Sequence, residues 1–172
     1  GSGCEIGPNA MVRDCIVGKD TTINASQVNE STIGSHTTVG PFTYVRPNCR
    51  IGDHCRVGDF VEVKNSVIGD GTKISHLTYV GDSDVGQRVN FGCGTVTTNY
   101  DGHKKHRCTI GDDVFLGCNT NLIAPVTVAD RAYTAAGSTV TDDVPEGALA
   151  IARQRQTNIR GWADRLRKTW KK

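Results

Sequence analysis

A histidine and a tyrosine lie close together in an otherwise apolar stretch, Ile74-Ser75-His76-Leu77-Thr78-Tyr79-Val80-Gly81. Imidazole titrates near neutrality, so a histidine is well suited to take up and release a proton at physiological pH. A single surface histidine is more often an ordinary surface residue. His76 therefore needs partners before a catalytic role can be inferred for it.

Two cations, Arg46 and Lys64, are eighteen residues apart. If residues at this interval lie on neighbouring strands, the two side chains are about 5 Å apart. In water their repulsion costs only about 1 kcal/mol, so the pair can exist without a ligand. A phosphate between them would make the arrangement favourable, because arginine offers a planar fork and lysine a point charge. Spacing alone leaves both interpretations open.

His36 and His54 are also eighteen residues apart. Two histidines can contribute to a zinc site, but a protein zinc site needs at least a third ligand, and none is evident at the same interval. Two exposed imidazoles are the simpler interpretation.

A regular spacing of aliphatic residues predicts the elements that position these side chains. One follows another every six residues at Ile33, Val39, Val45, Ile51, Val57 and Val63, and the pattern extends in both directions with some steps of five. This period is neither that of a helix nor that of a simple strand. It indicates short strands separated by corners, with three sides closing a coil of about eighteen residues and successive coils stacking in parallel. Gly-Asp pairs at 52, 58, 69, 81 and 111 are expected at the corners.

The same spacing predicts a column of outward side chains. If Ile74, Phe91, Leu116 and Thr134 occupy one side in successive coils, the residues two positions later form the column His76, Cys93, Cys118 and Ala136. Small residues next to a histidine suggest a groove for a long, thin ligand whose reactive end stops at His76.

Two segments depart from the six-residue pattern. Residues 97–109 are polar and are expected to form an extruded loop. Beyond residue 145, steps of three and four between Ile159, Trp162, Leu166 and Trp170 predict an amphipathic helix over 156–170, with basic residues that are mostly solvated. We therefore expect a tag or linker remnant at 1–5, an all-β parallel β-helix domain at 6–145, and a C-terminal arm with a helix at 146–172.

Composition limits the possible functions. With 20 basic and 18 acidic residues, the chain has a net charge of only +2, which does not favour binding to nucleic acid or to a membrane. The seven cysteines contain no C-x-x-C pair, so neither a disulfide framework nor a zinc cage is predicted. No apolar run reaches the ~18 residues that span a bilayer. We expect a soluble, cytoplasmic protein.

The six-residue pattern resembles that of the hexapeptide-repeat acyltransferases, whose fold is a left-handed parallel β-helix; the handedness comes from the resemblance. Residues 6–160 resemble more specifically the acetyltransferase half of the bacterial bifunctional GlmU family. The resemblance rests on the motifs Val45-Arg46-Pro47, Glu62-Val63-Lys64, 76–82, 89–95, Asn99-Tyr100-Asp101-Gly102, 110–115 and 124–128.

This resemblance implies a glucosamine-1-phosphate N-acetyltransferase that uses acetyl-CoA and no metal, in the route to UDP-N-acetylglucosamine and bacterial cell-wall and lipopolysaccharide precursors. His76 would be the general base, helped by Glu62. The family's sugar-phosphate contacts fall on Arg46, Lys64, Tyr79, Asn90 and Lys105. Its acetyl-CoA contacts fall on Cys93, Asn99, Tyr100, Cys118, Ala136 and Arg153, with the backbone amide of Cys93 donating to the developing oxyanion.

The family is a homotrimer with sites between subunits, which the resemblance implies for this chain too. Cys93 and Cys118 stand where the family commonly has alanine and serine, which would place two thiols near the thioester. The glycine-rich nucleotide-binding region of the uridyltransferase half is absent, so we expect no uridyl transfer. Three alternatives remain: another hexapeptide-repeat sugar or amino-acid acetyltransferase, a zinc-dependent hydrolyase on the same fold, and a non-catalytic solenoid that serves only trimer assembly.

Overall fold

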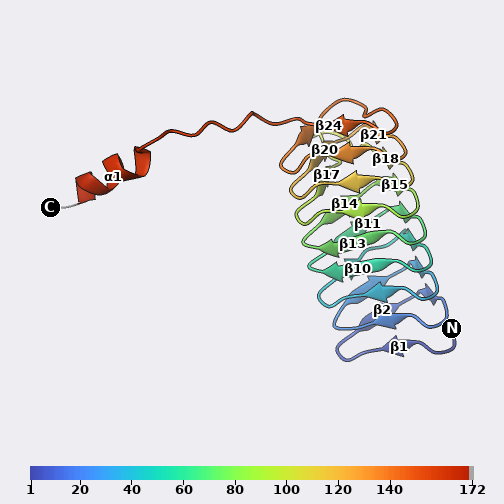
Figure 1. Cartoon of the computed structure of the whole chain (residues 1–172). Coiled ribbons are helices and arrows are strands. Elements are labelled where there is room, and N and C mark those ends of the chain that lie inside the picture. Colours follow the sequence, from blue (N-terminus) through green and yellow to red (C-terminus); the bar gives the residue numbers. More distant parts are fainter. Residues whose placement is uncertain (171–172) are drawn as a thin grey trace.

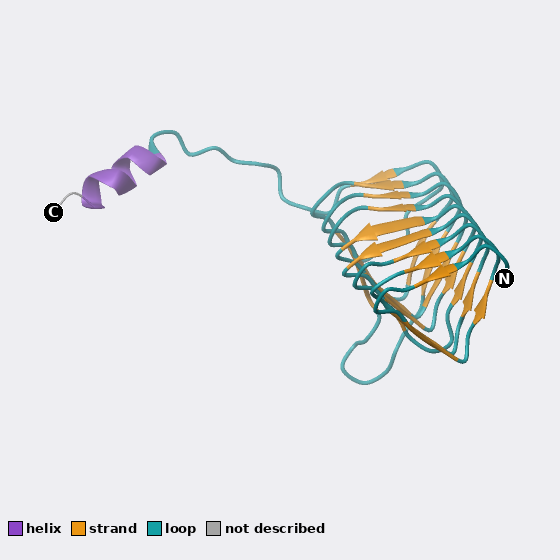
Figure 2. Ribbon diagram, turned by 90° about the horizontal axis from the view of Figure 1, so that it is seen from below, coloured by secondary structure: helices purple, strands orange, loops and turns teal. Residues whose placement is uncertain are grey.

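Short parallel strands alternate with corners from Glu5 to Ala150, as the six-residue spacing predicts. The computed structural model describes residues 1–170, which form a left-handed β-helix with a C-terminal arm leaving one end (Figure 1). Seen from below, the coils lie one behind the other and outline a prism (Figure 2), whose three sides are three parallel sheets. Each side of the prism is one sheet, and we call the strand that one coil contributes to a sheet a rung.

The first sheet has nine strands, the second eight and the third seven. The first contains β1 (Glu5–Ile6), β4 (Thr22–Ile23), β7 (Thr38–Val39), β10 (Arg56–Asp59), β13 (Lys73–His76), β16 (Asn90–Phe91), β19 (Phe115–Leu116), β22 (Tyr133–Thr134) and β24 (Leu149–Ala150). The second contains β2 (Met11–Arg13), β5 (Gln27–Asn29), β8 (Tyr44–Val45), β11 (Glu62–Lys64), β14 (Tyr79–Gly81), β17 (Val96–Thr98), β20 (Asn121–Ile123) and β23 (Thr139–Val140). The third contains β3 (Ile16–Val17), β6 (Thr32–Ile33), β9 (Arg50–Ile51), β12 (Val67–Ile68), β15 (Ser83–Val85), β18 (Cys108–Ile110) and β21 (Val126–Val128).

The parallel register stacks the regularly spaced aliphatic residues on one another. Ile33 pairs with Ile51 and Ile51 with Ile68, steps of eighteen and seventeen residues. The five-residue steps in the sequence therefore belong to slightly shorter coils. Ile74 pairs with Phe91, Phe91 with Leu116 and Leu116 with Thr134, which confirms the side chosen for the column.

The interior of the prism contains one aliphatic and one small residue for most sides of each coil. Ile68 and Ile74 are almost fully buried, and each buried side chain of this size contributes about 1.5–3 kcal/mol. Threonine is tolerated in the small position because its hydroxyl bonds to a backbone carbonyl of the next coil, as Thr37 Oγ1 does to Gly52 O at 2.9 Å. Cys49 and Cys55 fill the same position, as expected.

The corners show why glycine precedes aspartate. A Cβ at Gly52 would clash with Oδ1 of Asp70, the carboxylate oxygen that accepts a hydrogen bond from Asp53 N at 2.8 Å. The glycine thus leaves room for an aspartate of the next coil to cap the corner. Not every Gly-Asp pair has this role: Gly58 and Asp59 lie within β10, so the expectation of a corner there is wrong.

The extruded loop is present but shorter than 97–109. Thr97 and Cys108 are fully buried in β17 and β18, so the excursion consists of residues 99–107. The coil that carries it measures twenty-five residues, from Thr97 to Leu122. A loop projects from the outline of the prism in Figure 2.

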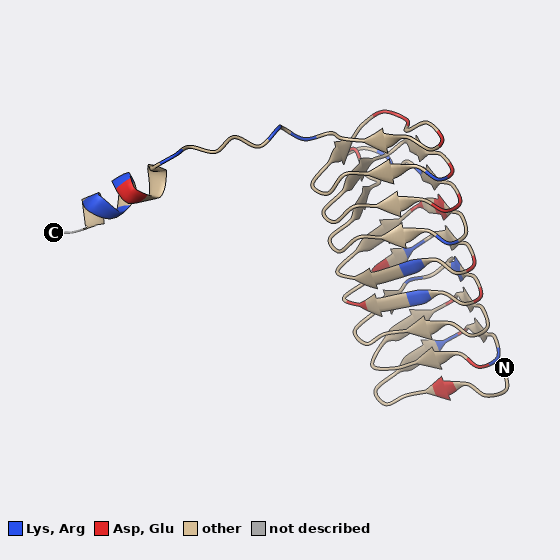
Figure 3. Cartoon of the chain, viewed as in Figure 1, with Lys and Arg blue, Asp and Glu red and all other residues tan. Residues whose placement is uncertain are grey.

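The C-terminal helix, α1, covers Trp162–Trp170 and not the whole of 156–170. Gly161 has a φ of +69°, a conformation incompatible with a right-handed helix, so the helix begins after it. The arm extends away from the solenoid, Lys and Arg recur along it (Figure 3), and no residue of α1 is buried. Among residues 1–170, no helix is long and apolar enough to cross a membrane.

Candidate active site

His76 ends β13 at the rim of the first sheet, and its ring contacts a carboxylate on the previous rung. His76 and Asp59 are register partners, with Nδ1 of His76 3.6 Å from Oδ2 of Asp59. Because Nδ1 faces the carboxylate, Nε2 is the ring nitrogen left free to accept a proton. A neighbouring carboxylate stabilises the imidazolium that proton transfer creates.

The residues that follow His76 along the axis form the expected column. Cys93, Cys118 and Ala136 are exposed, and their coils are joined by hydrogen bonds from Asn119 N to Cys93 O and from Gly137 N to Cys118 O, both 2.8 Å. The amides of Gly92 and Gly94 donate to the neighbouring coils, whereas within residues 1–170 the amide of Cys93 donates to no protein acceptor. The column therefore presents a free N–H one rung from His76.

The cation pair, Arg46 and Lys64, lies on adjacent rungs of the second sheet, as the spacing predicted. Arg46 N donates to Val63 O at 2.8 Å, which sets the two cations side by side in the ladder. Each has its own carboxylate partner: Arg46 Nη1 lies 2.9 Å from Glu62 Oε1, and Lys64 Nζ lies 3.7 Å from Asp82 Oδ2. The hydrogen bond to Glu62 raises the pKa of Arg46, so its charge is permanent.

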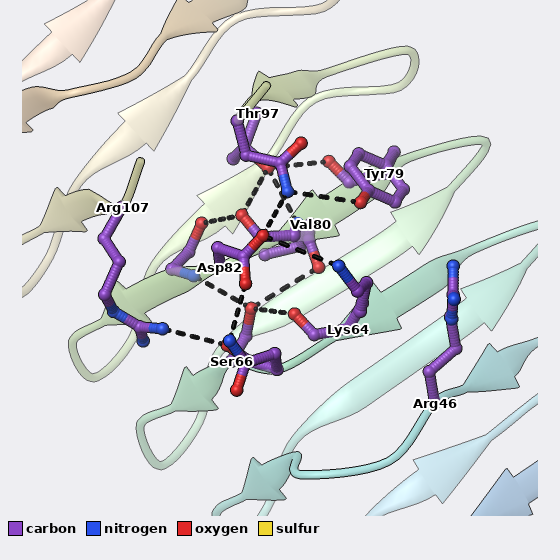
Figure 4. A network of polar contacts seen from close by, with 12 residues as sticks. Arg46, Lys64, Ser66, Tyr79, Val80, Asp82, Thr97 and Arg107 are labelled. Carbon is purple, nitrogen blue, oxygen red and sulfur yellow. Dashed lines mark hydrogen bonds and ion pairs between the residues drawn. The ribbon is translucent and has the colours of Figure 1, made fainter. Parts of the chain in front are cut away.

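Asp82 is the centre of a buried polar network (Figure 4). Only 4% of it is exposed, and its carboxylate accepts hydrogen bonds from Asn65 Nδ2, at 2.5 Å, and from Asn99 Nδ2. Burial alone would raise the pKa of Asp82, but these two hydrogen bonds and the nearby charges of Lys64 and Lys105 outweigh it and hold the pKa below its usual value. Asp82 is therefore ionised at neutral pH.

Tyr79 and Lys105 complete this side of the site. Tyr79 is the register partner of Glu62, and its hydroxyl is 3.4 Å from Asn99 Nδ2. Lys105 lies in the loop and contacts Lys64; this contact, followed by burial, lowers the pKa of Lys64. A surface hollow of about 380 Å³ is lined by Arg46, Pro47, Asn48, Lys64, Asn65, Asp82 and Lys105. Three cations around one hollow suit an anionic ligand.

The remaining predicted site residues are more dispersed. Asn90 is partly buried on β16, between Lys73 and Phe115 in the register. Tyr100 is 56% exposed in the loop, where its hydroxyl donates to Gly102 O. Arg153 is exposed in the arm, and its Cδ would lie 3.7 Å from a Cβ at Gly137, which puts the arginine at the Ala136 end of the column.

The site consists of two groups of residues separated by a corner. His76 and its column lie at the end of the first sheet, whereas Glu62, Lys64 and Tyr79 lie on the second. Within residues 1–170, no hydrogen bond or ion pair joins His76 to the second group. The corner between them exposes Phe42, Phe60 and Leu77, each about 60% accessible.

His36 and His54 lie on neighbouring coils, as their interval of eighteen residues predicted. Their rings stack face to face, with centroids 4.8 Å apart and planes 9° apart. Across the part of the chain that the structure describes, no group of three or more His, Cys, Asp or Glu side chains is placed to hold a metal ion.

Asp59 and Asp82 were missed in the sequence because both follow a glycine and were interpreted as corner residues. The coil interval does identify them. Asp82 is eighteen residues after Lys64, and Asp59 is seventeen before His76. Searching for acidic residues at the two coil intervals, seventeen and eighteen residues, would have found both.

Comparison with known proteins agrees with this architecture. The family described as "Bacterial transferase hexapeptide (six repeats)" matches residues 30–65 and 107–142. The bifunctional protein GlmU of Oceanobacillus iheyensis is 62% identical over 97% of this chain, and that of Clostridium acetobutylicum is 56% identical over 95%. The chain spans a little over a third of the length of these relatives, 37% and 36% respectively.

Two solved structures share the fold. Perosamine N-acetyltransferase from Caulobacter crescentus, solved as a histidine-to-asparagine mutant with CoA and GDP-perosamine, has a TM-score of 0.60 and 26% identity, covering 67% of this chain and 53% of that one. UDP-N-acetylglucosamine acyltransferase from Campylobacter jejuni also has a TM-score of 0.60, with 18% identity over 97% of this chain and 83% of that one.

A three-sided parallel solenoid built on six-residue repeats defines the class of hexapeptide-repeat transferases. Within that class, identities of 53–62% over some 95% of its length match this chain to the C-terminal acetyltransferase part of GlmU proteins.

Proposed function

We propose that this chain transfers the acetyl group of acetyl-CoA to the amine of glucosamine-1-phosphate, giving N-acetylglucosamine-1-phosphate. One observation carries the proposal: a histidine backed by a carboxylate stands at the foot of a column of small residues, one corner away from a hollow lined by three cations. The histidine can remove a proton next to acetyl-CoA bound along the column, and the hollow can hold the phosphate of the acceptor. High identity to GlmU proteins supports this donor and acceptor.

The chemistry is a direct transfer. The neutral amine of the sugar attacks the thioester carbonyl carbon, the carbonyl oxygen becomes an oxyanion, and Nε2 of His76 takes the proton that the nitrogen loses. Collapse of the intermediate breaks the C–S bond and releases coenzyme A. The free amide of Cys93 is the donor to the oxyanion, a type of contact worth about 10²-fold or more in rate. Glu62 keeps Arg46 oriented at the acceptor side.

The acceptor phosphate binds between Arg46, Lys64 and Lys105, with Tyr79 and Asn90 as further contacts to the sugar phosphate. Arg46 uses one nitrogen on Glu62, so other N–H groups of its guanidinium remain for the ligand. Coenzyme A follows the column past Cys118 and Ala136, with Asn99 and Tyr100 at the loop and Arg153 at its phosphates. Measuring the binding of each substrate separately to variants of these residues tests which residues bind the acceptor and which bind coenzyme A.

We further propose that the chain works as a homotrimer. A site open along one edge needs a second surface to exclude water. The arm exposes Ile159, Trp162 and Trp170, each at least 54% accessible, and these apolar side chains can be covered by a neighbouring copy. Light scattering after gel filtration should give about three times the chain mass of 18.5 kDa. A monomer at micromolar concentration would contradict this assembly.

The product would serve the synthesis of UDP-N-acetylglucosamine in the bacterial cytoplasm, and from there cell-wall and lipopolysaccharide precursors. The test of function is direct: incubate the chain with acetyl-CoA and glucosamine-1-phosphate and detect the N-acetylated sugar phosphate by mass spectrometry. Product detection avoids thiol dyes, which would react with the seven cysteines. Absence of product at high enzyme concentration would refute the proposal.

A second candidate acceptor is a nucleotide-linked amino sugar. The perosamine N-acetyltransferase that shares the fold was solved with GDP-perosamine, and it supports this alternative at 26% identity. Competition between glucosamine-1-phosphate and a nucleotide-linked amino sugar, with kcat/KM measured for each, decides between the two acceptors.

A further inference from the structure

Asp82 contacts both ends of the extruded loop. Its carboxylate accepts a hydrogen bond from the side chain of Asn99, the first residue of the loop. Its backbone carbonyl accepts one at 3.2 Å from the amide of Cys108, the residue that follows the loop. One corner residue therefore fixes the point where the chain leaves the prism and the point where it returns.

The same carboxylate faces the cation pair. Oδ2 of Asp82, which accepts from Asn99, also lies 3.7 Å from Nζ of Lys64 (Figure 4). The Lys64 side chain is only 17% exposed, so its stem is constrained as well as its charge. A single buried anion thus links the loop to a cation that lines the hollow.

Asp82 opposes the positive charges around Lys64. Arg46 on the strand before it and Lys105 in the loop are both positive and face Lys64, and Asp82 is the negative group that faces it. Contact with Lys105 and burial lower the pKa of Lys64, while Asp82 raises it. Removing the negative charge of Asp82 leaves Lys64 between two cations, and the remaining carboxylate, Glu62, pairs with Arg46.

We propose that Asp82 is the positioning residue of the acceptor site: it holds the ammonium group of Lys64 in place while anchoring, through Asn99, the loop that carries Lys105. The role rests on the proposed function, because it concerns how that acceptor is held. Asp82 acts through Lys64, which was assigned to the acceptor, and through Asn99, which was assigned to coenzyme A. It therefore links the two groups of residues.

The first test needs no substrate. An acetylating reagent such as succinimidyl acetate reacts with neutral amines, so the labelling rate of Lys64, followed by peptide mass spectrometry, reports its neutral fraction at each pH. Compare the unmodified chain with Asp82→Asn and with Asp84→Asn. Asp84 is the matched control because it pairs with Arg107 at the end of the loop, at 2.6 Å, and has no ion pair with Lys64.

Asp82→Asn should increase the labelling rate of Lys64 roughly tenfold near pH 8, since loss of the attraction lowers the pKa of the lysine. Asp84→Asn should leave that rate unchanged. Hydrogen exchange should be faster at residues 99–107 in both variants, because each loses a contact at the loop. Equal labelling of Lys64 in the Asp82→Asn variant and the unmodified chain would overturn the proposal.

The second test uses the proposed reaction. In the Asp82→Asn variant, the KM for glucosamine-1-phosphate should rise roughly tenfold, and the alkaline limb of kcat/KM for this acceptor should move to lower pH, because Lys64 loses its proton earlier. Asp82→Glu, which restores the charge, should move the limb back. If the unmodified chain makes no product, the proposed function fails while the labelling experiment still decides the role of Asp82.

Discussion

The ring of His76 and the carboxylate of Asp59 face each other across one rung of the first sheet, with Nδ1 and Oδ2 3.6 Å apart. The pairing follows from the coil length: seventeen residues bring the chain back to the same edge one rung higher. A proton acceptor and a group that stabilises its charged form are thus set side by side by backbone register, and this relationship can be tested.

Replacing His76 with alanine should lower kcat by about 10² to 10⁴, the usual contribution of a general base, without unfolding the chain. The side chain is exposed, so its removal leaves no cavity. Product formation measured by mass spectrometry and the thermal midpoint by circular dichroism check both points. His54→Ala is the control, since His54 lies at another corner and should keep full activity. A fully active His76→Ala variant would remove the base assignment.

Replacing Asp59 with asparagine should lower kcat about tenfold and change the KM for acetyl-CoA little. The two charged groups are partly solvated, so the carboxylate stabilises the imidazolium by only about 1 to 1.4 kcal/mol. Steady-state kinetics at saturating acceptor separates the two parameters. Combining Asp59→Asn with His76→Ala should add no further loss, because Asp59 is expected to act through the histidine. Additive losses would show an independent role.

Replacing Arg46 with alanine should raise the KM for glucosamine-1-phosphate by ten- to a hundredfold, as expected for loss of a charge-assisted contact of about 1.5–3 kcal/mol. The effect should disappear when glucosamine without phosphate is the acceptor, at whatever low rate it reacts. Arg56→Ala, an exposed arginine on the first sheet, is the matched control. Equal sensitivity of the two acceptors would mean that Arg46 does not bind the phosphate.

Thiol reactivity should divide the cysteines by position. Burial raises the pKa of Cys49, Cys55 and Cys108, in the last case to about 11, so these thiols are almost wholly protonated at pH 8 and shielded from reagents. Cys93 and Cys118 are exposed on the column. Iodoacetamide should therefore label these two first, and acetyl-CoA should slow their labelling. Labelling that acetyl-CoA leaves unchanged would argue against the column as its binding groove.

The interior should be sensitive at single positions. Ile68 is 2% exposed and Val67, its neighbour on β12, is 43% exposed. Ile68→Ala should cost about 2–5 kcal/mol in the free energy of unfolding, whereas Val67→Ala should cost well under half as much. Denaturant titration at fixed protein concentration measures both. Similar losses would contradict the inward orientation of Ile68.

The sequence predicted most of the fold because each coil repeats one physical rule. The unbroken run from Ile33 to Val63 determines which side chains point inward, and parallel register then determines which residues stack, so the column from His76 to Ala136 followed from spacing. Gly58 was misassigned because a Gly-Asp pair has the same composition in a strand and at a corner.

Side-chain partners were harder to predict. Arg46 and Lys64 were placed correctly on adjacent rungs, yet the coil interval did not show that Glu62 would pair with Arg46. The two residues are sixteen positions apart, and the rotamers of their side chains bring the charges together. The arm shows a different limit. Its helix begins at Trp162 because Gly161 adopts a positive φ, which the period of Ile159 and Trp162 does not reveal.

The stacking of coils also gives the column a regular axial spacing. Every group along the column is displaced from the next by one rung, about 4.8 Å, so the axial distance from His76 to Ala136 is three such steps, roughly 14 Å. The length of a ligand that fits along the column is therefore set in multiples of the rung spacing. Preference for a longer or shorter ligand can then change by moving a bulky or charged residue to the equivalent position of the next coil, while the histidine and the core beneath it stay as they are.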